Sequence, residues 1–519
     1  MTEVVDGIRP QHGLRLDELL RELPEGSRLV GDGSVRVHGV RHDSRRVRAG
    51  DLFVVRKGAQ TDGARFVADA KKRGAVAVLA PEGVAETADL PKIAVEDPVV
   101  GLALAAAAVY EHPSFGLEVI GITGTNGKTT TTHLVRAAVD GALGAPRCGL
   151  IGTLGFQFGA LDVEASHTTP EADDLMRAML AMRRGGATHV AMEVSSIALS
   201  LGRVHAVRFF VAAYTNLTQD HLDFHGTMEA YGEAKARLFG EHAPGTSVVC
   251  VDGEFGRSLA ARVRGPLVRV SAHVGADADI VPTRLELSAR GIAATLRTPE
   301  GALEVRSPLV GAHNVENLVV ALGVVHALGL DLAAGARALD GERGAPGRLE
   351  RCDGAEDDVS VLVDYAHTPD ALARVLDAVR AVTKGRVLCV FGCGGDRDAK
   401  KRGPMGAAVA ERADVAVITN DNPRTEDPVA IAAPIDAAVR AAGMRALTPP
   451  ELATGRGYVV ELDRARAIEL AVLAARPGDV VLLAGKGHED YQIVGAEKRH
   501  FDDREEARRV LLVRRAGGA

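Results

Sequence analysis

Tryptophan is absent from this sequence of 519 residues, and only 3% of the residues are aromatic. Proteins that bind single-stranded nucleic acid stack its bases on aromatic side chains, so the composition argues against that class. The formal net charge of −7 also lacks the basic excess that a phosphate backbone attracts. The composition therefore predicts no nucleic-acid partner.

Cysteine is scarce as well. The five cysteines, at positions 148, 250, 352, 389 and 393, form no even framework, and the last two do not have CxxC spacing. This pattern predicts reduced thiols in a cytoplasmic protein and neither a disulfide scaffold nor a cysteine metal site.

Long apolar runs are also missing. A helix that spans a bilayer needs about 20 apolar residues, whereas the longest run is LALAAAAVY at 102–110. The opening segment, MTEVVDGIRPQHGLRLDELL, lacks the basic start and apolar core of a signal peptide. We expect a packed helix at 102–110, no membrane insertion, and a cytoplasmic monomer.

The sequence does have a regular alternation of short β-branched runs, glycine-containing turns and alanine-rich stretches. This alternation predicts an α/β protein with parallel sheets covered by helices. At about 150 residues per domain, the length favours about three domains, and the glycine- and proline-containing segments 111–116 and 341–348 mark boundaries. We predict a small N-terminal α/β domain over 1–116, a central parallel-sheet domain over 117–345 and a C-terminal Rossmann-like domain over 346–519.

Polar clusters follow the predicted strands of the second and third domains. Open α/β sheets bind ligands at the carboxyl ends of their strands, so we expect one site built between these two domains. Any turn is polar, but these ends also carry charged and imidazole side chains. They are Lys128, Glu193, His221, Arg397 and Arg424.

The stretch GITGTNGKTTTT follows a predicted strand, EVIGIT, and opens a predicted helix, KTTTTHLVRAAVD. At such a turn the helix dipole and the free backbone N–H groups favour an anion. Gly124 and Gly127 allow close backbone approach, and Lys128 can reach the β- and γ-phosphates of a nucleotide. Thr129 or Thr130 can hold magnesium.

One position departs from the usual P-loop spelling, because Ile122 stands where that pattern has its first glycine. A GKT triplet can also arise by chance in a chain with 58 glycines. The triplet by itself does not say whether a bound nucleotide drives motion, signalling or synthesis.

Further segments along nearly the whole chain belong with this loop. In chain order they are HDSRRVRAGDLFV, SHTTPE, AMEVSS, YTNLTQDHLDFHGTMEAYGEAKARLF, GAHNVENLVVAL, APGRLE, VDYAHTPDAL, FGCGGDRDAKKRGPMG, TNDNPRTEDP and GKGHEDYQIV. With the TGTNGKT loop, this set resembles the Mur ligases and the related folylpolyglutamate synthases.

The resemblance implies a ligase with a central P-loop-type sheet that binds ATP. Its implied reaction adds meso-diaminopimelate to the D-glutamate of UDP-N-acetylmuramoyl-L-alanyl-D-glutamate. The carboxylate is activated as an acyl phosphate, ADP and phosphate are formed, and the product is a peptidoglycan precursor. The implied partners are therefore small-molecule substrates.

The resemblance also implies the residues that bind ATP, and a helix N-cap is the competing interpretation of Asn314. His367, in the segment VDYAHTP, also matches a position that contacts ATP in the family. The ATP-binding set is Gly124, Thr125, Asn126, Gly127, Lys128, Thr129, Thr130, Asn314, Asn317, Arg348 and Asp364.

Magnesium and a lysine carbamate are implied cofactors. Lys235 would react with carbon dioxide, which requires a neutral amine and hence a lowered pKa; otherwise it is a surface lysine. Glu193 could instead be an exposed strand end, and His221 a loop residue or, with His225, half of a zinc site. The implied metal-binding set is Thr129, Glu193, His221 and Lys235 as the carbamate, and the catalytic set is Lys128, Lys235 and His221.

A third implied set contacts UDP-muramoyl-dipeptide. Leu201 departs from the family pattern, which has a glutamine contact there, and His167 stands where some members have asparagine. The signal is weakest in the first domain, where HDSR alone could be any turn. The set is His42, Ser44, Ala59, Gln60, Thr61, His167, Thr168, Thr169, Ser195 and Arg203.

The form DNPR resembles the members of the family that use diaminopimelate. A guanidinium can grip the second carboxylate of this substrate, which lysine lacks, while Asn422 and Glu489 can accept from its distal ammonium. A plain turn around Pro423 is the alternative. The implied set is Arg397, Asp421, Asn422, Pro423, Arg424, Gly485 and Glu489.

Three other functions compete with this interpretation. A folylpolyglutamate synthase would share the central chemistry but lack the first domain and DNPR. A P-loop switch or motor would hydrolyse ATP without forming a bond. A catalytically inactive binding module would not need the charged set that this chain retains.

Overall fold

The structure is a computed structural model that describes residues 6–56, 63–84, 89–165 and 167–517. The chain forms two compact units. One comprises the residues up to Val281 together with Asn317–Ala338, and the other comprises Pro282–Glu316 with the residues from Leu339 onward. The predicted boundaries of three domains stay a prediction. Among the described helices, none combines the length and apolarity that a bilayer crossing requires.

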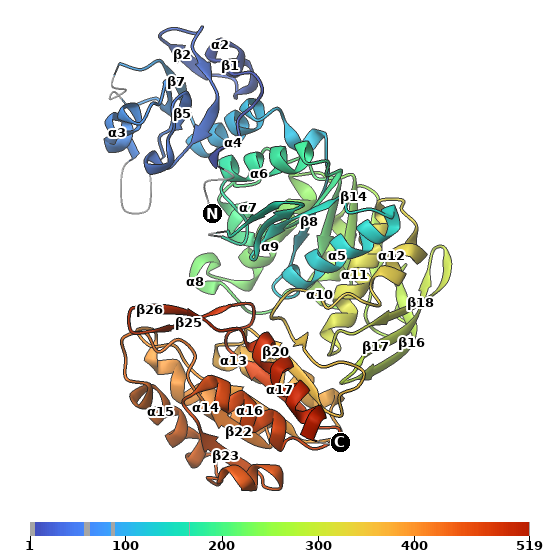
Figure 1. Cartoon of the computed structure of the whole chain (residues 1–519). Coiled ribbons are helices and arrows are strands. Elements are labelled where there is room, and N and C mark those ends of the chain that lie inside the picture. The colour runs from blue at the N-terminus through green and yellow to red at the C-terminus, as the bar shows by residue number, and fades with distance from the viewer. Residues whose placement is uncertain (1–5, 57–62, 85–88, 166, 518–519) are drawn as a thin grey trace. The chain divides into compact units, whose positions relative to one another are not determined.

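The first unit begins with a five-stranded sheet, in which four strands are parallel and β2 is antiparallel. Helix α4 (Pro98–Val109) is nearly all buried, as the apolar run at 102–110 predicts. The predicted small α/β fold is thus confirmed (Figure 1). The strands, in sheet order, are β2 (Arg28–Val30), β7 (Lys92–Val95), β6 (Ala77–Pro81), β5 (Asp51–Val54) and β4 (Gly39–Arg41).

The same unit contains an eight-stranded sheet with β8 (Glu118–Thr123) between two parallel neighbours. Helix α5 (Lys128–Leu143) follows β8, so the predicted strand, loop and helix are confirmed. The antiparallel edge pair β10 and β11 was not predicted. In sheet order the strands are β11 (Leu161–Val163), β10 (Gly155–Phe158), β9 (Cys148–Gly152), β12 (His189–Glu193), β8, β13 (Val211–Tyr214), β14 (Thr246–Cys250) and β15 (Leu267–Val270).

Five helices on this part of the chain carry site residues or lie beside them. They are α6 (Ala172–Arg184), α7 (Ser196–Ser200), α8 (Leu222–His225), α9 (Met228–Gly240) and α10 (Glu254–Arg262). The antiparallel strands β16 (Val281–Ser288), β17 (Gly291–Thr298) and β18 (Gly301–Ser307) follow, and then α11 (His313–Ala327) and α12 (Leu332–Ala338).

The second unit contains a six-stranded sheet with a hydrophobic cluster on each face. Successive side chains along a strand belong alternately to the two clusters. Cys389 and Phe391 pack on one face with α13 (Pro369–Val382), α14 (Arg402–Arg412) and α15 (Pro428–Ala441). Leu388 and Val390 pack on the other face with α16 (Arg464–Ala474) and α17 (Asp503–Gly517). Helices on both faces of a mostly parallel sheet confirm the Rossmann-like prediction (Figure 1).

Five of these six strands are parallel, and the short edge strand β19 is antiparallel. In sheet order they are β19 (Glu350–Arg351), β20 (Ser360–Asp364), β24 (Val480–Ala484), β21 (Val387–Phe391), β22 (Val415–Ile418) and β23 (Gly457–Val460). A hairpin of β25 (Tyr491–Val494) and β26 (Glu497–His500) follows the sheet.

A buried ion pair joins two helices of this unit to the ends of two strands. Arg464 donates to both carboxylate oxygens of Asp503, at 2.7 and 2.6 Å, and both side chains are fully buried. The same guanidinium donates to the carbonyl of Asn420 after β22, at 3.2 Å, and to that of Ala484 at the end of β24, at 3.0 Å. These strand ends begin the segments DNPR and GKGHE.

We expect Arg464→Met to lower the free energy of unfolding by about 3–5 kcal/mol, because it leaves Asp503 buried without its cation. Urea unfolding followed by circular dichroism measures the change. Arg466→Met is the matched control, since Arg466 is exposed on the same helix and its substitution costs below about 1 kcal/mol. Adding Asp503→Leu to Arg464→Met is expected to recover much of the loss, and equal losses for the two arginine variants would contradict the role of this pair.

Candidate active site

The loop between β8 and α5 has a backbone that only glycine tolerates at two positions. Gly124 has φ +155° and Gly127 has φ +82°. A Cβ on Gly124 would lie 1.9 Å from Thr215 Oγ1, and one on Gly127 would lie 2.2 Å from Asn317 Oδ1. Close approach of other groups to the loop backbone therefore explains both glycines.

The segment after β13 holds this loop in place. Thr125 N–H donates to Asn216 O at 2.8 Å, and Asn126 N–H donates to Asn216 Oδ1 at 3.0 Å. The Thr215 hydroxyl donates to Asn126 O at 2.8 Å, and Thr125 Oγ1 donates to Thr218 O at 3.2 Å. The sequence predicts no role for this segment, YTNLT.

Two lysines donate to one carbonyl of the loop. Lys128 Nζ lies 2.9 Å from both Gly124 O and Thr125 O. Lys235 Nζ, which comes from α9, lies 2.8 Å from Gly124 O. Lys235 is 1% exposed, and its Nζ lies 4.3 Å from the centre of the Tyr231 ring. The interpretation of Lys235 as a surface lysine is therefore wrong.

This environment changes the proton affinity of the Lys235 amine. Burial, and secondly the positive charge of Lys128, lower the pKa of Lys235 from 10.5 to about 6. Both causes penalise the ammonium form. The side chain is therefore a neutral amine near pH 7.5, which is the state that the carbamate hypothesis requires.

Glu193 ends β12 beside the loop and is 2% exposed, so the interpretation as an exposed strand end is wrong. Its Oε2 accepts from Thr129 Oγ1 at 2.9 Å, and its Oε1 accepts from Thr153 N–H at 2.8 Å. A carboxylate beside a threonine hydroxyl supplies the hard oxygen ligands that Mg²⁺ prefers. The residues present therefore fit this ion.

His221 is exposed and has φ +51° at the start of α8. Its ring centre lies 6.1 Å from that of Tyr231, the same ring that faces Lys235. His225 Nε2 lies 3.0 Å from Ser196 Oγ. Within the described residues, the two histidines belong to no group of three possible metal ligands.

The end of β12 also gathers the predicted contacts to the acceptor substrate. The hydroxyl of Thr169 is 2.9 Å from both Glu193 O and Ser195 N. Thr168 Oγ1 accepts from Thr153 Oγ1 at 3.2 Å. Arg203 donates to Thr169 O at 3.1 Å.

A carboxylate that sequence reasoning missed joins this group to the N-terminal sheet. Glu171 lies 2.8 Å from Arg203 Nε and accepts from Arg56 Nη1 at 2.6 Å. Arg56 directly precedes the segment that contains Ala59, Gln60 and Thr61, and these three predicted residues lie outside the described residues. The signal was present, because Glu171 closes the quoted segment SHTTPE.

His42 lies 2.8 Å from a carboxylate oxygen of Asp173. Burial lowers the pKa of His42. The nearby carboxylates, chiefly that of Asp173, raise it by more, so the net shift is upward from 6.5. Ser44 is buried, whereas His167 is exposed and its pKa is lowered by partial burial and by the charge of Arg203. Leu201, which departs from the family pattern, is 38% exposed.

The two predicted asparagines of α11 have different surroundings. Asn317 Oδ1 accepts from the buried hydroxyl of Thr131 at 3.0 Å and lies against Gly127. Asn314 lies inside the helix, which begins at His313, and its Nδ2 donates to Val310 O at 2.8 Å. The N-cap alternative for Asn314 is therefore wrong.

In the second unit, Asp364 fixes the segment that carries Arg348. Its two oxygens accept from the N–H groups of Leu349, at 2.7 Å, and Ala366, at 2.8 Å, and burial raises its pKa. The guanidinium of Arg348 lies 5.2 Å from the ring centre of Tyr365. His367 Nδ1 lies 2.8 Å from Tyr365 O.

The DNPR segment is clamped by the β25–β26 hairpin. Arg424 has φ +52°, and its N–H donates to Ile493 O at 3.0 Å. Its Nη1 donates to Gly395 O at 2.9 Å and to Asn422 O at 3.4 Å. Pro423 is buried, Arg397 is exposed, and Gly485 has φ +117°. A strained, half-buried Arg424 marks a candidate ligand contact.

Asn422 differs from the sequence interpretation. It is 3% exposed, and its Oδ1 accepts from Ile493 N–H at 3.0 Å and from Lys486 Nζ at 3.3 Å. Its Nδ2 donates to Glu489 Oε2 at 3.0 Å. Because Ile493 N–H and Lys486 Nζ already use both lone pairs of this oxygen, it is not placed to accept from the ammonium of a substrate.

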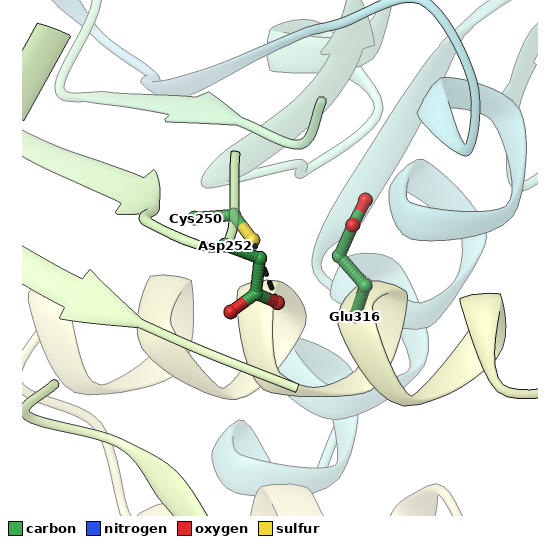
Figure 2. Close-up of side chains that lie close together, drawn as sticks. All are labelled: Cys250, Asp252 and Glu316. Atoms are coloured by element: carbon green, nitrogen blue, oxygen red, sulfur yellow. Dashed lines mark hydrogen bonds between the residues drawn. The ribbon is translucent and has the colours of Figure 1, made fainter. Parts of the chain in front are cut away.

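One other side-chain cluster resembles a metal site. Figure 2 shows the hydrogen bond between Cys250 and Asp252. Cys250 Sγ donates to Asp252 Oδ2, and the two atoms are 3.5 Å apart. The Asp252 carboxylate also accepts from Ser271 Oγ and from Ala272 N–H. These protein donors explain its orientation without an ion. All five cysteines are buried free thiols, as predicted.

The residues brought together thus form one group at the phosphate loop of the first unit and another around DNPR in the second. The single site predicted between the second and third domains stays a prediction. The two groups share one property, since each holds a buried lysine against its loop: Lys235 in the first and Lys486 in the second.

Comparison with known proteins gives consistent matches over most of the chain. Family models match three segments: "Mur ligase family, catalytic domain" at 36–110, "Mur ligase middle domain" at 122–325, and "Mur ligase, glutamate ligase domain" at 347–487.

Two relatives share the name UDP-N-acetylmuramoyl-L-alanyl-D-glutamate–2,6-diaminopimelate ligase. The one from Gloeobacter violaceus is 45% identical over 97% of this chain and 99% of its own length. The one from Geobacter metallireducens is 44% identical over 95% and 97%. A solved structure of an enzyme with the same name has a TM-score of 0.71 at 32% identity, and the match covers 97% of this chain and 99% of that chain.

The lowered pKa of Lys235 predicts a pH dependence of stability. Between about pH 6 and 10.5 the unfolded chain binds a proton at this amine and the folded chain does not, so the folded state gains stability as pH rises through this window. Lys235→Met removes the group. In carbon-dioxide-depleted buffer we expect its Tm to exceed that of the unsubstituted protein most at pH 6 and progressively less toward pH 9.

Melting followed by circular dichroism at several pH values measures this difference. Lys498→Met is the control, because Lys498 is exposed and its removal should shift Tm equally across the range. A pH-independent difference for Lys235→Met would show that the amine is protonated in the folded protein.

Proposed function

The chain belongs to the Mur ligase family, and we propose that it uses ATP to add meso-diaminopimelate to the D-glutamate of UDP-N-acetylmuramoyl-L-alanyl-D-glutamate. The observation that carries this proposal is the buried Lys235 amine, which shares the Gly124 carbonyl with Lys128 of the phosphate loop. The printed names of the relatives support the choice of substrates.

Residues Gly124 to Thr130 bind the phosphates of ATP, with Asn314, Asn317, Arg348 and Asp364 around the rest of the nucleotide. Lys128 leaves its loop carbonyls to neutralise the β- and γ-phosphates. The acceptor carboxylate attacks the γ-phosphorus, so that an acyl phosphate forms and ADP leaves. The substrate amine then attacks the acyl carbon, and phosphate leaves as the amide bond forms.

Lys235 works through a covalent change of its own. Its neutral amine attacks the carbon of carbon dioxide, an N–C bond forms, and the proton goes to water, which leaves a carbamate anion. The change converts a buried neutral amine next to Lys128 into an anionic group, which Lys128 attracts.

Thr129, Glu193, His221 and the carbamate of Lys235 would hold Mg²⁺, which supplies positive charge that lets two anions approach. The bonds from Thr129 and Thr153 already orient the Glu193 carboxylate. On the acceptor side, Thr168, Thr169, Ser195 and Arg203 orient the dipeptide.

The second unit binds the incoming amino acid. In the described part of the chain, the hydrogen bonds of the Arg424 side chain to protein groups all use Nη1, so Nη2 and Nε can grip the distal carboxylate. Glu489 accepts from the distal ammonium, and Arg397, Asp421, Pro423 and Gly485 complete the pocket.

The deciding experiment measures ADP release from ATP with UDP-muramoyl-dipeptide and a panel of meso-diaminopimelate, lysine and ornithine. We expect release that requires both the nucleotide substrate and diaminopimelate. Release without an amine would indicate a switch or motor, and activity with a folate acceptor would indicate a folylpolyglutamate synthase. A preference for lysine would overturn the specificity while leaving the ligase proposal intact.

Lys235→Ala is expected to lower kcat by about 100-fold or more, because the pocket loses an anion that neutralises bound charge. Added formate or acetate should restore part of the activity by supplying a carboxylate. Labelled bicarbonate gives an independent reading, since the unsubstituted protein should show a carbamate signal by NMR and the variant should not. Exposed Lys498→Ala should change neither measurement; no rescue and no signal would exclude the carbamate.

A further inference from the structure

Lys486 is a fully buried lysine in the second unit, in the loop that follows β24. Its Nζ lies 3.3 Å from Asn422 Oδ1, 3.4 Å from Glu489 Oε2 and 3.5 Å from Asp421 Oδ1. All three partners belong to the predicted diaminopimelate set, whereas Lys486 itself does not. A buried lysine ordinarily needs such partners to stay charged.

A backbone donor and Lys486 together determine which way the amide of Asn422 faces. Ile493 N–H is a fixed backbone donor 3.0 Å from Asn422 Oδ1, so the oxygen and not the nitrogen lies on that side. Lys486 donates to the same oxygen, and the amide nitrogen consequently faces Glu489 at 3.0 Å. Lys486 thus contacts Glu489 both directly and through Asn422.

The charges around this position follow from the same contacts. Asp421 and Glu489 bring two negative charges, with side chains that are 13% and 19% exposed, and Lys486 brings one positive charge at full burial. Removing the ammonium would make the pocket more negative by one charge and leave both carboxylates without their buried partner.

A change of this kind affects two substrates differently. The distal end of meso-diaminopimelate carries an ammonium and a carboxylate, so its net charge is zero. The distal end of lysine carries only the ammonium. A more negative pocket attracts the cationic end of lysine and repels the carboxylate of diaminopimelate, and specificity is the difference between these two affinities.

We propose that Lys486 is a specificity-determining residue, which offsets the charge of Asp421 and Glu489 and thereby favours diaminopimelate over lysine. This inference rests on the proposed function and deepens it. Lys486 acts through its neighbours, and the test therefore compares two substrates instead of measuring activity alone.

The experiment uses the full chain with Lys486→Met, which keeps the length of the side chain but removes the charge. Lys486→Gln is the second variant, because its amide can still donate to Asn422 or Glu489. Lys498→Met is the matched control. Lys498 lies 3.8 Å from the ring centre of Tyr491, which Lys486 also faces at 5.6 Å, but it is exposed.

ADP release is measured with meso-diaminopimelate and with lysine, and KM values for ATP and UDP-muramoyl-dipeptide are measured in parallel. For both Lys486 variants we expect the ratio of kcat/KM for diaminopimelate to that for lysine to fall by at least about tenfold. The KM for diaminopimelate should rise while the other two KM values stay unchanged. Lys498→Met should leave the ratio as it is.

An unchanged ratio in a folded variant overturns the proposal, as does a uniform loss with both amino acids. If neither variant folds by circular dichroism, Lys486 is a structural residue and the proposal is also overturned. Failure of the proposed function gives a different result, because the unsubstituted protein would then not use diaminopimelate at all.

Discussion

Two lysine nitrogens donating to the carbonyl of Gly124 are the constraint on which the rest of the candidate site depends. Two ammonium groups at one oxygen repel each other, and burial together with the charge of Lys128 lowers the pKa of Lys235. A neutral Lys235 amine relieves this repulsion. The fold therefore sets the proton affinity of this amine, because the Gly124 carbonyl holds both lysine nitrogens.

The same principle of fixed partners explains how the second unit holds its charged groups. Arg464 ties Asn420 and Ala484 together across the ends of β22 and β24, which lie on either side of β21, and these ends begin the segments with Arg424 and Lys486. Backbone carbonyls and N–H groups then orient the side chains. Arg424 and Asn422 each have a backbone partner, and Lys486 and Glu489 are held by side chains, so these groups already have partners before any ligand binds.

The sequence was sufficient to predict the parts of the structure that depend on local pattern. The strand, loop and helix around Gly124, the alternation of the C-terminal strands and the buried helix at 102–110 all follow from spacing. Burial of Lys235 was also predictable, because Tyr231, Lys235 and Leu238 recur at helical spacing and all three are buried. The contacts of Glu171 and Asn422 were not, since their partners are tens of residues away and depend on tertiary packing.

Residues that contact a ligand and residues that hold them look the same in a sequence segment, and Asn422 shows why the distinction matters. Its place in DNPR suggested a direct contact, yet a backbone N–H and Lys486 occupy its oxygen. Asp364 is a second example, because its carboxylate is committed to two backbone N–H groups. In both cases the side chain stabilises a loop that presents another residue, Arg424 or Arg348. A segment can therefore be typical of a substrate class although some of its side chains are already bonded to the protein itself.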